Sequence, residues 1–165
     1  FGRIGQEVAK RAIGLGMKII VHDKFIDKAN ITLEFFNGDK KSFTIETESL
    51  KAVLKNSDFI TLHIPKIGNK AVIGAKEIGM MKTGAGIINA ARGGVIDETA
   101  LMFALDKEKL AYAGLDVFDN EPNPSIHLLM HGAVSLTPHI GAATLEAQDR
   151  IGTELAEQIC AYFNK

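Results

Sequence analysis

Segments with helical spacing of apolar residues alternate with short, continuous apolar runs along most of this sequence. Residues 4–15 carry apolar side chains at helical intervals, and the run 17–21 follows directly. Short apolar runs without in-and-out alternation are typical of parallel strands that are buried on both faces. The order therefore predicts an α/β fold with a doubly wound parallel sheet. We expect further helices over 50–55, 75–81, 98–107 and 145–163, and further strands over 59–64, 86–89, 111–117 and 134–137.

One segment, residues 29–46, instead alternates apolar and polar side chains, which is the pattern of a hairpin. Ile31 and Leu33 precede the turn signal at 37–38, and Phe43 and Ile45 follow it. All four side chains can share one face only if the loop contains an odd number of residues. We therefore expect a loop of three or five residues rather than two, and we expect the hairpin to extend the edge of the sheet.

Composition excludes several classes of protein. The 165 residues are 46% hydrophobic and 24% charged, with a formal net charge of -1, which is typical of one globular domain with a real core. So small a net charge gives no reason to expect a nucleic-acid or membrane partner. The single cysteine, Cys160, excludes an intramolecular disulfide and a cysteine metal cluster, and we expect no metal site. We expect Cys160, Met80 and Met81 to be packing residues.

No apolar run approaches the about 20 residues that a membrane span requires, and the first residues lack a signal-peptide pattern. We therefore expect a cytoplasmic protein. The sequence opens on Phe1 and reaches its first glycine at Gly2, so we expect it to open inside a motif.

That motif is typical of dinucleotide binding. Gly2 and Gly5 stand at the start of the first helix, and Asp23 ends the strand that follows, about 20 residues further on. A helix N-terminus offers N–H groups to a pyrophosphate, Gly5 permits close packing of helix and strand, and Asp23 can bind both ribose hydroxyls. We expect NAD as the cofactor, bound by Gly2, Arg3, Ile4, Gly5 and Asp23. Capping of a turn is the alternative role for Asp23.

Three downstream motifs resemble the D-isomer-specific 2-hydroxyacid dehydrogenase family. They are residues 89–101, residues 114–118 with Glu121-Pro122, and residues 136–142. The resemblance extends over the whole sequence and implies that residues 1–165 form an NAD-binding domain. That domain would be incomplete at its N-terminus, because the first strand and first glycine are missing, and the substrate domain lies outside the sequence. Residues 141–148 resemble the phosphoglycerate dehydrogenase branch most closely.

The resemblance implies a catalytic set of Arg92, Glu121 and His139. Reducing a 2-oxo acid needs a cation for the carboxylate and carbonyl oxygens and a proton donor for the developing alkoxide. The planar guanidinium of Arg92 suits the first task, and the imidazole of His139, with an ordinary pKa of about 6.5, suits the second. Glu121 would bond to one imidazole nitrogen, fix the tautomer and favour the imidazolium form.

The resemblance also implies cofactor contacts downstream. Asp116 corresponds to the family position that contacts the nicotinamide carboxamide, and its place at a strand end agrees with the side on which open α/β sheets bind ligands. The loop that begins at His63 corresponds to the adenine side, although Lys66 to Gly68 depart from the family's commoner leucine and threonine. The remaining contacts expected are His63, Ile64, Pro65, Asn89, Ala90, Ala91, His139 and Gly141.

The implied activity is hydride transfer between NAD(H) and a D-2-hydroxy acid, with 3-phospho-D-glycerate, and hence serine biosynthesis, as the leading assignment. A hydroxypyruvate or glyoxylate reductase and a D-lactate dehydrogenase remain alternatives, since these differ mainly in residues outside this sequence. A nucleotide-sensing scaffold like the corepressors that resemble the family is an alternative of another class. We expect the full-length protein to be a homo-oligomer, a dimer or tetramer, with a small-molecule substrate.

Overall fold

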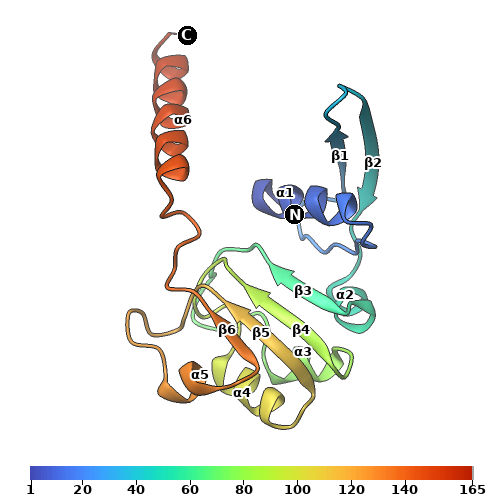
Figure 1. Ribbon diagram of the computed structural model, residues 1–165, viewed down its shortest axis with the longest axis vertical. Helices are drawn as coiled ribbons and strands as arrows, with labels where there is room; N and C mark the ends of the chain where they lie inside the picture. Colours follow the sequence, from blue (N-terminus) through green and yellow to red (C-terminus); the bar gives the residue numbers. More distant parts are fainter. Residues whose placement is uncertain (165) are drawn as a thin grey trace.

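Four short strands form a parallel sheet in the order β3-β4-β5-β6 (Figure 1). The computed structural model describes residues 1–164. The strands are β3 (Phe59–Leu62), β4 (Ala85–Asn89), β5 (Leu110–Leu115) and β6 (Val134–Leu136). Central strand β4 is buried except at Ile88, as a parallel strand flanked on both edges requires. The predicted α/β class with a parallel sheet is confirmed.

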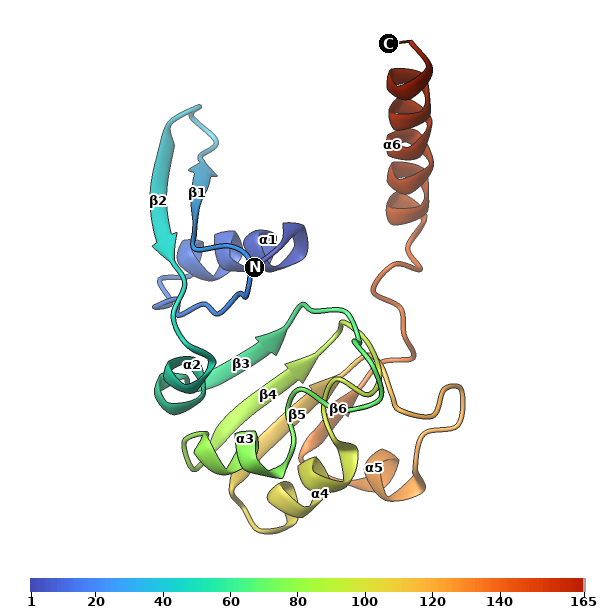
Figure 2. The same cartoon turned by 180° about the vertical axis from the view of Figure 1, so that it is seen from behind.

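The connecting helices gather on one side of this sheet, as Figures 1 and 2 show. They are α2 (Leu50–Asn56), α3 (Ala75–Met80), α4 (Glu98–Asp106) and α5 (Ile126–Met130). Three begin with a side-chain cap, because the oxygens of Ser49, Asp97 and Ser125 accept a hydrogen bond from the N–H three residues later. Sheet and helices enclose one apolar core, whose most buried side chains include Leu54, Ile73, Ile87, Leu101, Leu110 and Leu128.

A smaller unit is formed by α1 (Arg3–Gly14) and the antiparallel strands β1 (Lys28–Glu34) and β2 (Lys40–Glu46). Ile31 pairs with Phe43, and five residues, 35–39, join the strands, so the predicted odd loop is confirmed. The hairpin is a separate two-stranded sheet, so its predicted place at the edge of the main sheet is wrong. The inner face of the hairpin packs on α1, with Ile31 in one apolar cluster with Ala9 and Phe1. The hairpin therefore contacts α1 more closely than it contacts the main sheet.

The strand predicted over residues 17–21 is not part of any sheet. Its one strand-like pairing is a parallel bridge between Val21 and Thr47, reinforced by a hydrogen bond of 2.7 Å from the N–H of Glu48 to the carbonyl of Val21. Ile19 and Val21 pack into the small cluster beneath the hairpin. An apolar run becomes a strand only where a partner strand lies beside it, and among residues 1–164 strand β3 pairs with β4 alone.

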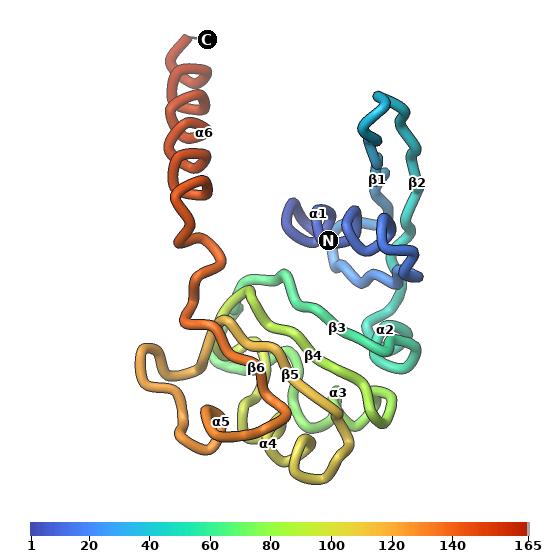
Figure 3. Tube along the Cα trace, in the orientation of Figure 1, coloured from blue at the N-terminus to red at the C-terminus, as the bar shows by residue number. Residues whose placement is uncertain are grey.

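The last helix, α6 (Leu145–Phe163), extends away from the sheet (Figures 1 and 3). The predicted helix is confirmed, but its apolar stripe is exposed, since no residue of α6 is buried. Cys160 is exposed as well, so its predicted packing role is wrong, whereas Met81 is buried and Met80 is partly buried. Within residues 1–164, no helix has both the length and the apolar character of a membrane span.

Candidate active site

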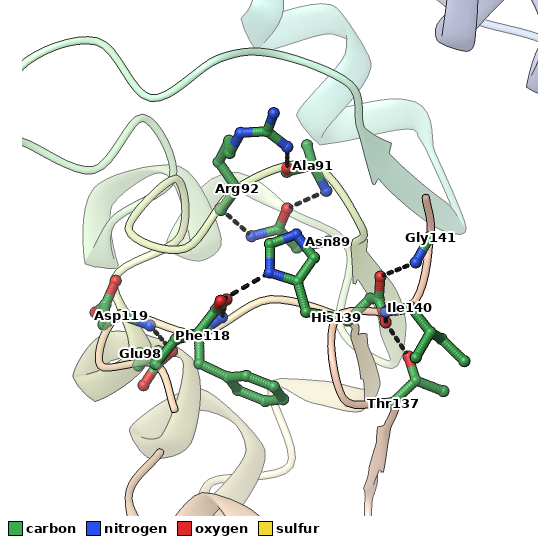
Figure 4. Close-up of polar contacts among 12 residues, drawn as sticks. Asn89, Ala91, Arg92, Glu98, Phe118, Asp119, Thr137, His139, Ile140 and Gly141 are labelled. Atoms are coloured by element: carbon green, nitrogen blue, oxygen red, sulfur yellow. Dashed lines mark hydrogen bonds and ion pairs between the residues drawn. The ribbon is translucent and has the colours of Figure 1, made fainter. Parts of the chain in front are cut away.

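The loops that follow β4, β5 and β6 meet at one edge of the sheet. The strands are parallel, and the register pairs Asn89 with Leu115 and Leu115 with Leu136, so the three carboxyl ends lie side by side. Figure 4 shows the polar side chains gathered there. In open α/β sheets this is the edge where ligands bind. The predicted residues Asn89, Arg92, Asp116, Glu121, His139 and Gly141 all follow or end these strands.

Glu121 and His139 form a hydrogen-bonded pair at this edge. Glu121 Oε2 lies 2.7 Å from His139 Nδ1, and Glu121 Oε1 accepts a hydrogen bond of 2.9 Å from the N–H of Phe118. The bond with His139 and then the bond from Phe118 hold the pKa of Glu121 below its ordinary value. The carboxylate is therefore ionised near neutral pH, and the second imidazole nitrogen, Nε2, is left to act on a ligand.

The backbone of His139 adopts an unusual conformation. Its φ is 56°, in the left-handed region that non-glycine residues seldom occupy. Such conformations persist where the surroundings enforce them, and they cluster at functional sites. Here Asp116 fixes the loop residues on either side of His139, and the imidazole is bonded to Glu121.

Asp116, which is 8% exposed, fixes the loop that carries His139. Its Oδ1 accepts hydrogen bonds from Thr137 Oγ1 at 2.5 Å and from the Ile140 N–H at 2.9 Å, and its Oδ2 accepts one from the Gly141 N–H at 3.0 Å. Burial raises the pKa of Asp116, but these hydrogen bonds outweigh burial, and the pKa lies below its ordinary value. Sequence reasoning missed this role, because the partners lie 21 to 25 residues further along the chain.

Asn89 shapes the turn that presents Arg92. The buried Asn89 side chain donates a hydrogen bond of 2.9 Å to the carbonyl of Arg92 and accepts one of 3.1 Å from the N–H of Ala91. Its backbone carbonyl accepts a hydrogen bond from Asp116 N–H, which ties this turn to the end of β5. The Arg92 side chain is exposed, with Nη1 donating to the carbonyl of Ala91 at 2.6 Å. Most of its guanidinium is therefore available to a ligand.

Gly93 brings the Arg92 turn against the Glu121 loop. A methyl group built on Gly93 would overlap the carbonyl of Phe118, whose N–H is bonded to Glu121. Only glycine permits this approach, so the position next to Arg92 has a structural requirement as well as a chemical one. Through this contact the three residues predicted to be catalytic belong to one cluster of loops.

A second group of predicted residues lies around the start of α1. Gly2 is the N-cap of α1 and provides no side-chain cap, and a methyl group built on it would meet no atom within 4 Å. Asp23 Oδ1 accepts hydrogen bonds from the N–H groups of Phe25 (2.8 Å) and Ile26 (3.1 Å), and Oδ2 contacts the amino group of Phe1. Asp23 therefore caps a turn, the alternative role, while standing beside the glycine motif.

The loop after β3, which was predicted to contact the cofactor, is the last member of this second group. A methyl group built on Gly5 would lie 3.7 Å from His63 Cβ, an ordinary contact, so the expected need for glycine at position 5 is not strict. His63 is half-buried, and burial lowers its pKa. Ile64 and Pro65 follow on the same loop. Arg3 forms a forked ion pair of 2.6 and 3.0 Å with Glu154 of α6, while Ile4 is exposed.

A hollow of about 310 Å³ lies beside the Glu121–His139 pair. Its walls are mostly apolar, with Phe118, Pro124, Leu129 and Leu136 among the lining residues. Among residues 1–164, no three histidine, cysteine or acidic side chains are grouped so that they could hold a metal ion.

Residues 1–141 match the family described as "D-isomer specific 2-hydroxyacid dehydrogenase, NAD binding domain". The chain belongs to this family. It is 41% identical over 163 residues to D-3-phosphoglycerate dehydrogenase 3 of Arabidopsis thaliana and 44% identical over 163 residues to hydroxypyruvate reductase of Thermotoga maritima. Both matches cover 96% of this chain but only 26% and 49% of those proteins, so the chain spans half or less of their length.

A solved structure of a glyoxylate reductase from Paecilomyes thermophila superimposes on 91% of this dehydrogenase domain, and on 43% of its own chain, with a TM-score of 0.75 and 36% identity. The NAD expected of this domain fits the residues around α1. The N-cap Gly2 makes no side-chain cap, so the first-turn N–H groups are open to an anion, and Asp23 lies beside them in contact with the amino group of Phe1.

Proposed function

We propose that the protein carrying this domain is an oxidoreductase that transfers hydride between NAD(H) and a D-2-hydroxy acid or its 2-oxo acid. The Glu121–His139 hydrogen bond of 2.7 Å, at the ligand-binding edge of the sheet, is the observation that carries this proposal. A carboxylate-oriented imidazole is a competent proton donor and acceptor near neutral pH. The Arg92 turn, packed on the same loop through Gly93, adds the cation that a 2-oxo acid requires.

Each residue of the set has a distinct task. The Arg92 guanidinium binds the substrate carboxylate and polarises the carbonyl oxygen. His139 Nε2 gives a proton to the developing alkoxide in reduction and takes it back in oxidation. Glu121 holds the imidazole through Nδ1 and stabilises its charged form, and Asp116 fixes the loop beneath it. Bound NADH supplies the hydride.

The substrate we propose first is 3-phospho-D-glycerate, with serine biosynthesis as the setting. The relative from Arabidopsis thaliana is named for that substrate, whereas the relatives from Thermotoga maritima and Paecilomyes thermophila are named as hydroxypyruvate and glyoxylate reductases. D-Lactate dehydrogenase is a further member of the same class. The shared catalytic set supports the reaction type, and the choice among these substrates depends on contacts that include residues beyond Arg92 and His139.

We propose further that residues 1–165 act as the NAD-binding domain and that a substrate domain completes the site. The chain covers 26% and 49% of its two relatives, which leaves room in proteins of that length for such a domain. A dimer or tetramer and a cytoplasmic location are part of the same proposal. The single, exposed Cys160 agrees with a reducing compartment.

Following NADH oxidation by the complete protein against phosphohydroxypyruvate, hydroxypyruvate, glyoxylate and pyruvate tests the function. We expect reduction of at least one of these acids, at a rate that His139→Ala lowers by about 10²–10⁴-fold. The proposal is wrong if the protein binds NADH but reduces none of them. That result favours the nucleotide-sensing alternative, which would be examined by measuring oligomeric state with and without NADH.

Asp23 predicts the choice between NAD and NADP. Its carboxylate stands beside the N-terminus of α1, where it would repel the 2′-phosphate of NADP. Replacing Asp23 with alanine in the complete protein should therefore narrow the preference for NAD, and Lys24→Ala is the control at the neighbouring cation. An unchanged ratio of the two kcat/KM values in Asp23→Ala would remove Asp23 from the ribose site.

A further inference from the structure

The side chain of Lys66 reaches the turn that follows Arg92. Lys66 lies on the loop after β3, yet a methyl group built on Gly94 would overlap its Nζ and would lie 2.6 Å from its Cε. Gly94 has a φ of 75°, so glycine suits both the conformation and the space there. The ammonium group thus lies against the backbone two residues beyond Arg92.

This ammonium group lacks a direct counter-ion. No ion pair or hydrogen bond joins Lys66 Nζ to another group within residues 1–164, although Asp119 Oδ1 lies 3.1 Å from the same point above Gly94. The backbone N–H of Asp119 donates a hydrogen bond of 2.7 Å to Glu98 Oε1 (Figure 4). Lys66 is exposed, so its charge is open to a ligand.

Its contacts place Lys66 with the catalytic loops rather than with the start of α1. Gly94 adjoins Gly93, which packs on Phe118, and Phe118 bonds Glu121, the partner of His139. The loop's contact with α1 is made by His63, three residues earlier. A cation at Gly94 therefore lies beside the loops that carry Arg92 and Glu121, where by the proposed function Arg92 binds one carboxylate.

We propose that Lys66 is a specificity-determining residue that binds a second anionic group, a phosphate or carboxylate, on the 2-oxo acid substrate. This inference rests on the proposed function and narrows its substrate class. One cation suffices for a 2-oxo acid with an uncharged tail, and a second cation beside it stabilises binding only when the tail is charged. An ammonium group suits this task, since it is a compact charge with three donors on a flexible stem.

Three alternative roles make different predictions. If Lys66 is only a solvated surface lysine, its replacement would not change kcat/KM selectively for any substrate. If Lys66 merely supports the Gly94 turn, its replacement would displace Arg92 and lower kcat/KM for all substrates alike. A contact to a cofactor phosphate would raise the KM for NADH with every substrate. Selectivity between substrates that differ only in the charge of the tail therefore separates the proposed role from the others.

The test measures kcat/KM of the complete protein for two matched pairs of acids. One pair is phosphohydroxypyruvate and hydroxypyruvate, and the other is 2-oxoglutarate and 2-oxopentanoate. The variants are Lys66→Met, which keeps the stem and removes the charge, Lys66→Arg, which keeps the charge, and Lys70→Met, an exposed control on the same loop. Thermal unfolding of each variant is measured alongside.

We expect Lys66→Met to lower kcat/KM for the charged member of one pair by about 10-fold or more, as loss of a charge-assisted hydrogen bond predicts. The uncharged member should change less than about 3-fold, the KM for NADH should stay constant, and Lys66→Arg should restore part of the loss. The affected pair identifies phosphate or carboxylate. Equal losses on both members, or a wild-type preference for uncharged tails, overturn the role of Lys66 while leaving the dehydrogenase intact. Failure to reduce any 2-oxo acid overturns the proposed function itself.

Discussion

At the scale of single residues, the pairing of Glu121 with His139 is the feature on which the chemistry depends. The hydrogen bond with His139 is the main cause that lowers the pKa of Glu121, and the N–H of Phe118 adds to it. A carboxyl group whose pKa is lowered by folding contributes stability above its ordinary pKa of about 4.3, and that contribution is lost as the pH falls through the lowered value. The pair is therefore complete at neutral pH.

This cause can be measured directly. Replacing His139 with alanine removes the stronger of the two hydrogen bonds, so the pKa of Glu121 should rise back toward its ordinary value. Titration of the Glu121 side-chain carbon by NMR in both proteins reports the change. Asp116 provides an internal comparison. Burial raises its pKa, but hydrogen bonds from Thr137, Ile140 and Gly141 outweigh burial, so the pKa of Asp116 should change less than that of Glu121. An identical titration of Glu121 in the two proteins would contradict the pairing.

At the scale of elements, the close approach of the loops after β4 and β5 depends on Gly93. A methyl group there would overlap the carbonyl of Phe118, which is backbone and cannot rotate away. We expect Gly93→Ala to destabilise the complete protein by about 1–3 kcal/mol, the usual cost of overpacking, and to lower activity by separating Arg92 from Glu121. Gly132→Ala is the matched control, because its added methyl would meet no atom within 4 Å. Equal thermal unfolding midpoints for the two variants would contradict the close approach.

The elements also show what the sequence could predict. The short continuous apolar runs predicted every strand of the main sheet, and parity predicted the odd loop of the hairpin, since both are local features of the sequence. Helix α5, five residues long, is too short to show a period. The run 17–21 has strand composition but no partner strand, and the stripe on α6 has no surface against it, because neither burial nor pairing is a local property.

The site was predictable to a similar extent. Arg92, Glu121 and His139 stand in motifs, and the structure joins Glu121 to His139 as predicted. The hydrogen bonds of Asp116 to the loop that carries His139, and the reach of Lys66 to Gly94, depend on contacts between distant strands and loops. Asn89 likewise acts through its side chain on the Arg92 turn rather than only through its backbone.

At the scale of the whole molecule, the outer edge of β3 bears on stability. Within residues 1–164, β3 pairs with β4 only, and Phe59 at its start is exposed. An unpaired edge with apolar side chains is a template for association. We expect the polypeptide of residues 1–165 alone to self-associate and to lack dehydrogenase activity, as light scattering and NADH oxidation would measure. A monomer that binds NADH tightly would contradict this expectation, and the complete protein is the control.

The central claim is that Arg92 and His139 act on the same substrate in different ways. Steady-state kinetics of His139→Ala and Arg92→Ala in the complete protein, with NADH binding measured separately, tests it most directly. Loss of the proton donor should lower kcat by about 10²–10⁴-fold with little effect on NADH binding. Loss of the guanidinium should raise the KM for the 2-oxo acid as well as lower kcat, because Arg92 would bind both substrate and transition state. Small and equal effects in the two variants would contradict the account.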